Sequence, residues 1–206
     1  MSFASEVLQV QGLLKSSQWK SMISDREIIL NAQLKNLANT NMKKYSFYTA
    51  MLVKNRLSMT RAVLTDYKVY SQLIPYIDYT EYSVKEHLLR IEGGIWSFRL
   101  KSKVYFQEVK ERWIHYEVTE GHFSGLTGDI YFENLQNEGT VVYLKGEKEG
   151  IHWPPRFVIE QGAEIVFGFT AKRMRSYIEN QKNPEKGVTN HGELQGQQIP
   201  QPRSHL

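Results

Sequence analysis

The sequence predicts an α+β fold in which one antiparallel sheet is covered on a single face by a long C-terminal helix. Three observations support this prediction. Apolar residues recur at every second position over much of residues 96–144, Gly-containing turn sequences separate these stretches, and helical spacing returns after Pro154 and Pro155. Alternating stretches joined by tight turns are typical of antiparallel strands with one buried face. Such a sheet requires a covering layer, which the final helix supplies.

The composition is that of one soluble domain. The chain has 206 residues, with 26 Lys and Arg against 22 Asp and Glu, and a formal net charge of +4. So small an excess among mixed charges indicates no nucleic-acid partner. The absence of cysteine excludes disulfides, thiolate metal sites and cysteine nucleophiles. We expect no signal peptide and no transmembrane segment, and the compartment stays open.

Two terminal segments flank the predicted domain of residues 26–182. In residues 1–25, apolar side chains recur at helical spacing from Val7 to Leu14, which predicts a short helical extension. Residues 183–206 are rich in Pro and Gln and hold few large aliphatic side chains. Such a segment cannot bury enough surface to offset the entropy cost of ordering, so we expect a disordered tail.

The domain begins with two predicted strands and two short helices. The β-prone runs at 27–30 and 45–53 flank the turn-rich segment 36–41, as two strands would. Ser58 is expected to cap the first helix and Asp66 the second, since short polar side chains accept hydrogen bonds from the first backbone N–H groups. An early strand followed by two short helices is therefore predicted.

The long alternating region predicts a meander, which brings the sheet to six or seven strands. Its inward face is rich in aromatic side chains, which are interpreted first as core and second as the wall of a binding site. Glycine-containing sequences mark the expected turns, at residues 92–94, 120–121, 137–139 and 149–150.

The final helix is predicted from Pro154 to about residue 182. At 100° per residue, one broad apolar face contains Val158, Ile159, Gly162, Ala163, Ile165, Val166, Phe169 and Tyr177, with Phe167 and Met174 at its margin. Arg173 projects near the centre of that face. We expect it to reach solvent near the helix C-terminus, with a ligand anion or a strand carboxylate as the alternative partner.

Three segments carry a resemblance to a known family. Residues 61–75 (RAVLTDYKVYSQLIP), 120–129 (EGHFSGLTGD) and 138–143 (EGTVVY) together resemble the START-like (SRPBCC) superfamily of helix-grip proteins, in its polyketide cyclase/dehydrase or coenzyme-Q-binding branch. Arg61 stands where that family usually has tryptophan. The resemblance implies a START/Bet v1-like helix-grip fold, in which a curved antiparallel sheet wraps around the long C-terminal helix.

This resemblance implies a cavity between sheet and helix that binds or transports a hydrophobic small molecule, such as a lipid, isoprenoid quinone or aromatic polyketide-like ligand. It implies no cofactor and allows transient membrane contact, while the oligomeric state stays open. Gly162 makes room for either a ligand or a close backbone. The expected ligand-binding residues are Trp96, Phe98, Phe106, Tyr116, Phe132, Val142, Ile159, Gly162, Ala163, Val166 and Arg173.

Two other functions remain as alternatives. One is a cyclase or dehydratase, whose candidate proton-transfer residues are Arg99, Glu81, Tyr116 or Arg173; the other is a protein-interaction module on the same fold. His115 and Glu117 share a strand face, which is interpreted as an exposed polar row rather than an acid/base pair. The six histidines form no metal-binding pattern, so we expect no metal.

Overall fold

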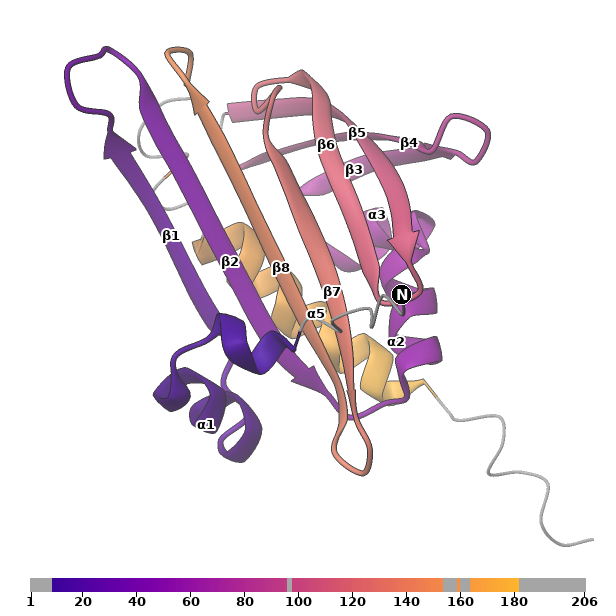
Figure 1. The fold of residues 1–206 in the computed structure, drawn as a ribbon. Coiled ribbons are helices and arrows are strands. Elements are labelled where there is room, and N and C mark those ends of the chain that lie inside the picture. Colours follow the sequence, from indigo (N-terminus) through magenta and orange to yellow (C-terminus); the bar gives the residue numbers. More distant parts are fainter. Residues whose placement is uncertain (1–8, 96–97, 154–158, 160–163, 182–206) are drawn as a thin grey trace, which may run out of the picture.

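One antiparallel sheet organises the molecule (Figure 1). Within the residues that the computed structural model describes (9–95, 98–153, 159 and 164–181), eight strands pair in the order β1-β2-β8-β7-β6-β5-β4-β3. They are β1 (Ile29–Asn36), β2 (Lys43–Val53), β3 (Ile77–Ser83), β4 (Leu88–Ile95), β5 (Phe98–Lys110), β6 (Trp113–Gly121), β7 (Thr127–Leu135) and β8 (Gly139–Gly150). Strands β3 to β8 form a meander, and β8 returns to pair with β2.

Short helices carry the chain from β2 to β3. They are α2 (Leu57–Thr65), η2 (Tyr67–Val69) and α3 (Tyr70–Leu73). As predicted, the Asp66 side chain caps the second of them by accepting a hydrogen bond from the backbone N–H of Lys68 (3.3 Å). The predicted cap at Ser58 is wrong, because α2 begins at Leu57 with Arg56 in the capping position.

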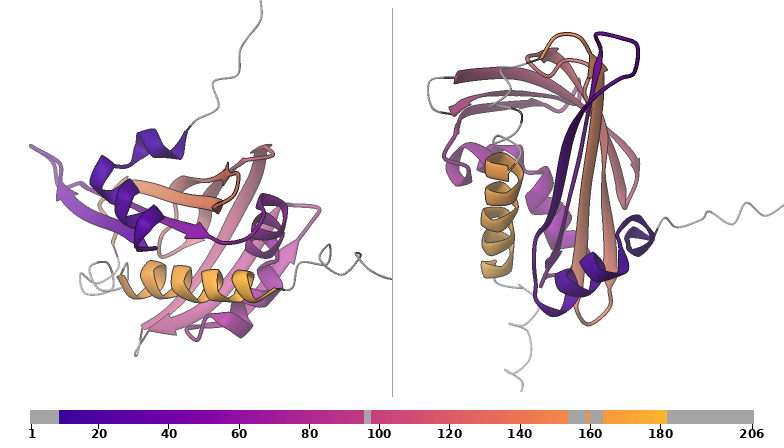
Figure 2. Two further views of the ribbon diagram at one scale, coloured as in Figure 1. Left: turned by 90° about the horizontal axis from the view of Figure 1, so that it is seen from below. Right: turned by 90° about the vertical axis from the view of Figure 1, so that its left-hand side faces the viewer.

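The sheet is bent, and the C-terminal helix lies across its concave inner face. In the right-hand view of Figure 2, β3, β4 and β5 fold over the end of α5 (Thr170–Asn180). Side chains alternate between the two faces: Tyr45 and Phe47 of β2 face inward, whereas Tyr48 and Leu52 pack on the outer face. The predicted α+β helix-grip architecture is confirmed, with eight strands where six or seven were expected.

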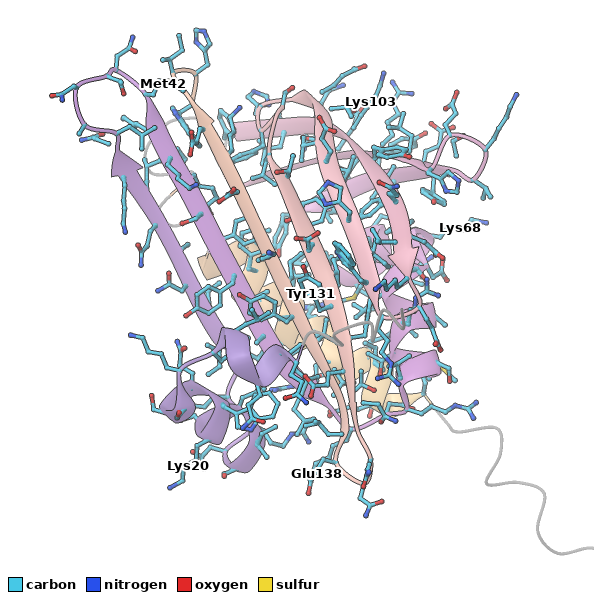
Figure 3. The ribbon with its side chains drawn as sticks, in the orientation of Figure 1. Lys20, Met42, Lys68, Lys103, Tyr131 and Glu138 are labelled. Atoms are coloured by element: carbon cyan, nitrogen blue, oxygen red, sulfur yellow. The ribbon has the colours of Figure 1, made fainter. Side chains whose placement is uncertain are left out.

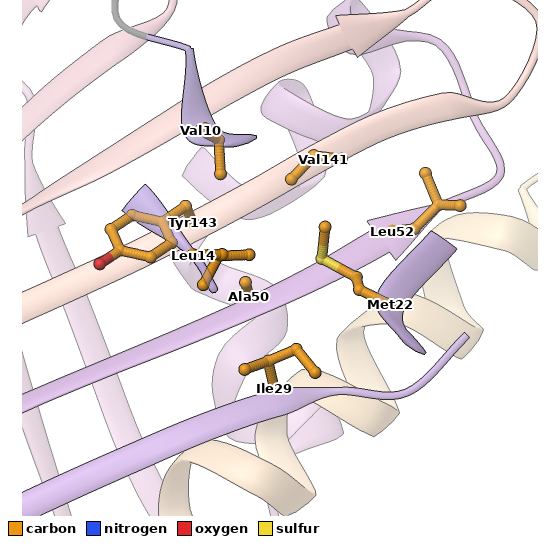
Figure 4. Packing of buried hydrophobic residues seen from close by; sticks show 8 residues of the cluster. All are labelled: Val10, Leu14, Met22, Ile29, Ala50, Leu52, Val141 and Tyr143. Atoms are coloured by element: carbon orange, nitrogen blue, oxygen red, sulfur yellow. The ribbon is translucent and has the colours of Figure 1, made fainter. Parts of the chain in front are cut away.

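The N-terminal helices pack against the outer face of the sheet (Figure 4). Segments η1 (Val10–Leu13) and α1 (Ser16–Ser24) bring Val10, Leu14 and Met22 against side chains of β1, β2 and β8. Met22 is completely buried. Each Å² of apolar surface removed from water in this way contributes about 25 cal/mol, so residues 10–24 stabilise the sheet that they cover.

Strands β3 and β4 are the part of the sheet that the alternation did not single out. The turn expected at residues 92–94 is wrong, because β4 continues through Gly93 and Gly94. The backbone N–H of Gly94 donates to the carbonyl of Tyr76 (2.9 Å), and a Cβ added at Gly93 would lie 2.0 Å from the same oxygen. These glycines therefore mark a close approach of two backbones instead of a turn.

A π-helical segment before α5 changes which residues of the C-terminal helix face the sheet. Segment η3 (Glu164–Phe169) is a π-helix, whose i→i+5 bonds enclose one residue more per turn than an α-helix. The extra residue rotates the following helix by about 100°. As a result Ala171, Met174 and Ile178 are buried, whereas Phe169 is 40% exposed. A projection as an unbroken α-helix places Phe169 on the apolar face, and that part of the prediction is wrong.

Candidate ligand-binding cavity

A cavity of about 350 Å³ lies between the inner face of the sheet and η3. Its volume is within the range of sites that enclose small molecules, about 300–1,000 Å³. Apolar side chains from six strands dominate its lining, which consists of Tyr45, Phe47, Tyr70, Leu89, Ile91, Leu100, Ser102, Val104, Phe106, Tyr116, Val118, Phe123, Leu126, Ile130, Leu144, Ile159, Val166 and Phe167. An apolar molecule placed there would lose its contact with water, which is favourable.

Tyr116 lies in the cavity wall beside glycines of two neighbouring strands. Its hydroxyl donates a hydrogen bond to the carbonyl of Lys145 (3.0 Å). A Cβ added at Gly128 or at Gly146 would lie 2.5 Å from that hydroxyl oxygen, so both positions must stay small. Burial raises the pKa of Tyr116, which keeps the hydroxyl neutral. The polar end of this side chain is therefore bound to the backbone, while its ring lines the cavity.

An aromatic stack joins the sheet to η3 across the cavity wall. The rings of Phe47 and Phe167 are stacked with centroids 4.2 Å apart, and such pairs contribute about 0.5–1.5 kcal/mol beyond their area. Tyr45, on the same face of β2, meets the ring of Trp153 edge-on at 6.2 Å. Burial raises the pKa of Tyr45 to about 12. The stack fixes the π-helical segment over the inner face.

A second cavity of about 240 Å³ adjoins the first and extends toward α5. The two cavities share the side chains of Tyr70, Ile91, Ile130, Leu144, Val166 and Phe167. Its lining also includes hydroxyl groups. Tyr76 donates to the carbonyl of Val166 (2.8 Å) and hydrogen-bonds the Thr170 hydroxyl, and Thr49 contributes a third hydroxyl from β2. The inner space thus combines apolar walls with a few hydrogen-bonding groups.

The structure places some of the predicted ligand-binding residues in the two cavities and others outside them. The main cavity is lined by Phe106, Tyr116, Ile159 and Val166. Val142 lines the second cavity. Phe132 is buried in the packed core with residues of α5, and Phe98 packs edge-on against His122, so neither lines these two cavities. The remaining predicted residues lie outside the described part of the chain: Trp96, Gly162 and Ala163.

Arg173, the last predicted ligand-binding residue, is exposed and lies outside both cavities. Its guanidinium carbon is 4.9 Å from the centre of the Phe169 ring, and one of its nitrogens donates to the carbonyl of Leu73 (3.4 Å). The rotation introduced by η3 turns both side chains away from the sheet. This position matches the favoured interpretation, in which Arg173 reaches solvent.

The residues considered for proton transfer do not come together. Glu81 and Arg99 are exposed, and each is paired with an opposite charge, Arg90 at 3.6 Å and Asp78 at 2.6 Å respectively. Tyr116 lines the cavity, but its hydroxyl is bound to a backbone carbonyl. These side chains and Arg173 therefore supply no convergent acid/base set in the cavity.

A polar cluster lies on the outer face of the sheet, beside Tyr131 (Figure 3). Asp129 accepts a hydrogen bond from the Trp113 indole (2.8 Å), lies 3.0 Å from His115 Nδ1, and is 3.2 Å from Lys145 Nζ. Burial raises the pKa of Asp129, but these hydrogen bonds outweigh burial and lower it below its usual value. His115 thus belongs to an outer polar row, as expected.

Metal sites and membrane-spanning helices do not occur in the described part of the chain. Over those residues, the structure gathers no three His, Asp or Glu side chains that could hold a metal ion. None of the helices there has the length and apolar character needed to cross a bilayer.

Solved structures with the same fold include a START superfamily protein from Mycobacterium smegmatis. Its TM-score is 0.55 at 16% identity, over 65% of this chain and 97% of that one. The structure of Ara h 8.0201 matches with a TM-score of 0.54 at 10% identity, over 67% of this chain and 99% of that one. The Zhui aromatase/cyclase from Streptomyces sp. R1128 matches with a TM-score of 0.53 at 14% identity, over 71% of this chain and 99% of that one. The chain therefore has the START-like helix-grip fold that its sequence resembles.

No family model and no curated protein matches the chain. At 10–16% identity, these structural similarities define a fold and not an activity. The coenzyme-Q-binding branch stays a prediction from sequence.

Sequence reasoning did not name several residues that form the cavities. Tyr45, Phe47 and Thr49 lie on the inner face of β2, and Phe167 lies on η3. The signal was present in β2, because these three residues occupy alternate positions of a strand that was predicted. Phe167 was predicted at the margin of the apolar helix face, because an α-helix was assumed there. In the structure the segment is a π-helix, and Phe167 lines the cavity.

Proposed function

We propose that the protein binds and carries a hydrophobic small molecule, of the lipid, isoprenoid quinone or aromatic polyketide-like class. The single observation that supports this function is the cavity of about 350 Å³ with an almost wholly apolar lining, formed between the sheet and η3. Polar atoms are few in this lining, as in sites that recognise apolar ligands. The adjoining cavity of about 240 Å³ adds room for a longer molecule.

The energetics of an apolar hollow favour a ligand. Side chains that border empty space lose dispersion contacts on that side, and a ligand of matching shape restores them. A ligand that binds only the folded state also raises stability, by about 2.7 kcal/mol when its concentration is 100 times its dissociation constant. Binding can therefore be detected as a shift in unfolding before the ligand is identified.

Carriage is favoured over catalysis because the cavity lacks a convergent proton-transfer set among the described residues. Of the four candidates, only Tyr116 reaches the cavity, and its hydroxyl is bound to the Lys145 carbonyl. A carrier needs shape, apolar walls and a polar contact for orientation, all of which are features of this cavity.

The direct test is native mass spectrometry of protein purified gently from its own host, followed by extraction with organic solvent. We expect an added mass that is released unchanged as an apolar compound. Protein that carries no ligand and takes up none of a series of apolar compounds would contradict the proposal.

A variant that fills the cavity provides a second test. Leu144 borders both cavities, so Leu144→Phe should weaken binding of Nile red, a neutral apolar dye, by tenfold or more. The matched control is Val109→Phe, which adds a ring at a position 37% exposed on β5. Equal dye binding by both variants would place the binding site elsewhere.

A further inference from the structure

The two inner cavities differ in the side chains that line them. Six of the described lining residues are shared, which leaves twelve that line only the main cavity and ten that line only the second. Five of those twelve are aromatic: Tyr45, Phe47, Phe106, Tyr116 and Phe123. Of those ten, one is aromatic and seven are apolar without a ring. The two cavities are therefore suited to different parts of a ligand.

Aromatic side chains form a continuous wall on one side of the main cavity. Phe47 stacks on Phe167, and the ring of Phe106 lies 6.2 Å from that of Tyr116 at an angle of 43°. The two pairs meet above Gly146 of β8, where an added Cβ would lie 2.7 Å from the Phe47 ring and 2.5 Å from the Tyr116 hydroxyl. An aromatic ring packed on such rings gains free energy beyond that of the area it buries. This wall therefore favours a flat ring over a saturated group of the same size.

The shared residues surround the junction of the two cavities. They come from the sheet, from η3 opposite it and from α3 at the side, and they are Tyr70, Ile91, Ile130, Leu144, Val166 and Phe167. Residues that border both cavities from several sides surround an opening between them. One molecule can therefore extend from the main cavity of about 350 Å³ into the second cavity of about 240 Å³.

We infer that the ligand is a flat ring joined to an aliphatic chain, with the ring on the aromatic wall of the main cavity and the chain in the second cavity. This inference rests on the proposed function and narrows the ligand classes that it allows. A plain acyl chain gains nothing from the aromatic wall, and a ring system without a chain leaves the second cavity empty. The ring gains from aromatic contacts, and the chain gains with each CH₂ group that leaves water.

The experiment measures displacement of Nile red from the full chain by three probes that are uncharged at neutral pH: 4-pentylphenol, 4-pentylcyclohexanol and 4-ethylphenol. The first two differ in whether the ring is flat, and the first and third differ in chain length. We expect 4-pentylphenol to bind about fivefold more tightly than 4-pentylcyclohexanol, the gain from one aromatic contact. It should bind at least tenfold more tightly than 4-ethylphenol, because three further CH₂ groups leave water.

Variants assign each part of the probe to a cavity. Ala171 on α5 is 7% exposed and lines only the second cavity, so Ala171→Leu should abolish the gain from the longer chain and leave 4-ethylphenol binding within twofold. Ala32→Leu makes the same change at an exposed position of β1 and should alter neither. Phe47→Leu should lose the preference for the flat ring and keep the gain from the chain. If Ala171→Leu does not fold, Val142→Ile fills the same cavity more mildly and should cut the chain gain at least twofold.

Each outcome separates this inference from the function beneath it. If 4-pentylcyclohexanol binds the native protein as tightly as 4-pentylphenol, the flat ring is overturned. If filling the second cavity weakens 4-ethylphenol and 4-pentylphenol by the same factor, the placement of the chain is overturned. In both cases the carrier function stands, because the dye and the probes still bind. If neither the dye nor any probe binds the native protein, the proposed function fails and this inference fails with it.

Discussion

Both faces of the sheet bury apolar side chains, but the outer face beneath the N-terminal helices is packed, whereas part of the inner face borders a cavity. On the outer face, Val10, Leu14 and Met22 of the N-terminal segment pack against β2 and β8, and none is more than 9% exposed. On the inner face, the residues around Tyr116 and Leu144 border about 350 Å³ of empty space. Apolar residues on the outer face therefore stabilise the fold, whereas those on the inner face also shape a binding site.

The largest effect is expected on the filled face. Met22→Ala should lower the free energy of unfolding by about 2–5 kcal/mol, because truncation of a fully buried side chain loses transfer energy and leaves a cavity. Urea titration followed by circular dichroism measures this loss. A loss below about 1 kcal/mol would mean that residues 10–24 contribute little to the core.

A smaller loss is expected where the inner face is tightly packed. In Gly128→Ala the new Cβ would meet the Lys145 carbonyl oxygen at 2.1 Å and the Tyr116 hydroxyl at 2.5 Å. Overpacking and loss of the Tyr116 hydrogen bond should together lower the free energy of unfolding by about 2–4 kcal/mol. In the control Gly150→Ala, the Cβ meets nothing within 4 Å, so stability should hardly change. Equal losses in both variants would contradict this account.

Adding the same ring on each side of the sheet tests the comparison directly. Leu52→Phe enlarges a residue that is 1% exposed on the filled face, and overpacking should lower the free energy of unfolding by about 1–3 kcal/mol. Leu144→Phe points the extra atoms into the hollow, so the change should stay within about 1 kcal/mol. Thermal unfolding of the two variants side by side gives the difference, and a reversed order would refute the contrast between the faces.

The smallest effect belongs to the polar cluster on the outer face. Its hydrogen bonds lower the pKa of Asp129 despite burial, so the ionised carboxylate stabilises the folded state. That contribution is present above the usual value of 3.8 and is lost as the pH falls through the lower folded-state pKa. Asp129→Asn should therefore cost about 1–2 kcal/mol at pH 7 and less at pH 3. Urea titrations at both pH values measure this, and a cost independent of pH would exclude the ionised carboxylate as its source.

Much of the fold was predictable because period-two alternation reports which face of a strand is buried. Phe106 and Tyr116 were assigned to the inner face, and both line the cavity. Gly93 was misread, since a glycine needed for close backbone approach looks the same in a sequence as a glycine in a turn. Strand β3 (Ile77–Ser83) was not singled out, because it lies at the edge of the sheet and has no fully buried residue to produce a clear alternation.

The site was harder to predict than the fold, and the positions of Arg173 and Met174 show why. Helical projection assumes 3.6 residues per turn, and the π-helix η3 breaks that assumption without a sequence signal that marks it. Everything after it is rotated, so Met174 is buried and Arg173 is exposed. The stacking of Phe47 on Phe167 depends on how two segments distant in the sequence pack together, which a single sequence does not encode.

The hollow on the inner face also determines how the molecule responds to pressure. Unfolding removes internal voids and so reduces the volume of the system, and this reduction grows with the void volume that is eliminated. An apolar cavity of about 350 Å³ adds to the volume that unfolding eliminates. A molecule bound in it would remove that void. The pressure at which half of the protein unfolds therefore reports whether the cavity is occupied, without any knowledge of the occupant.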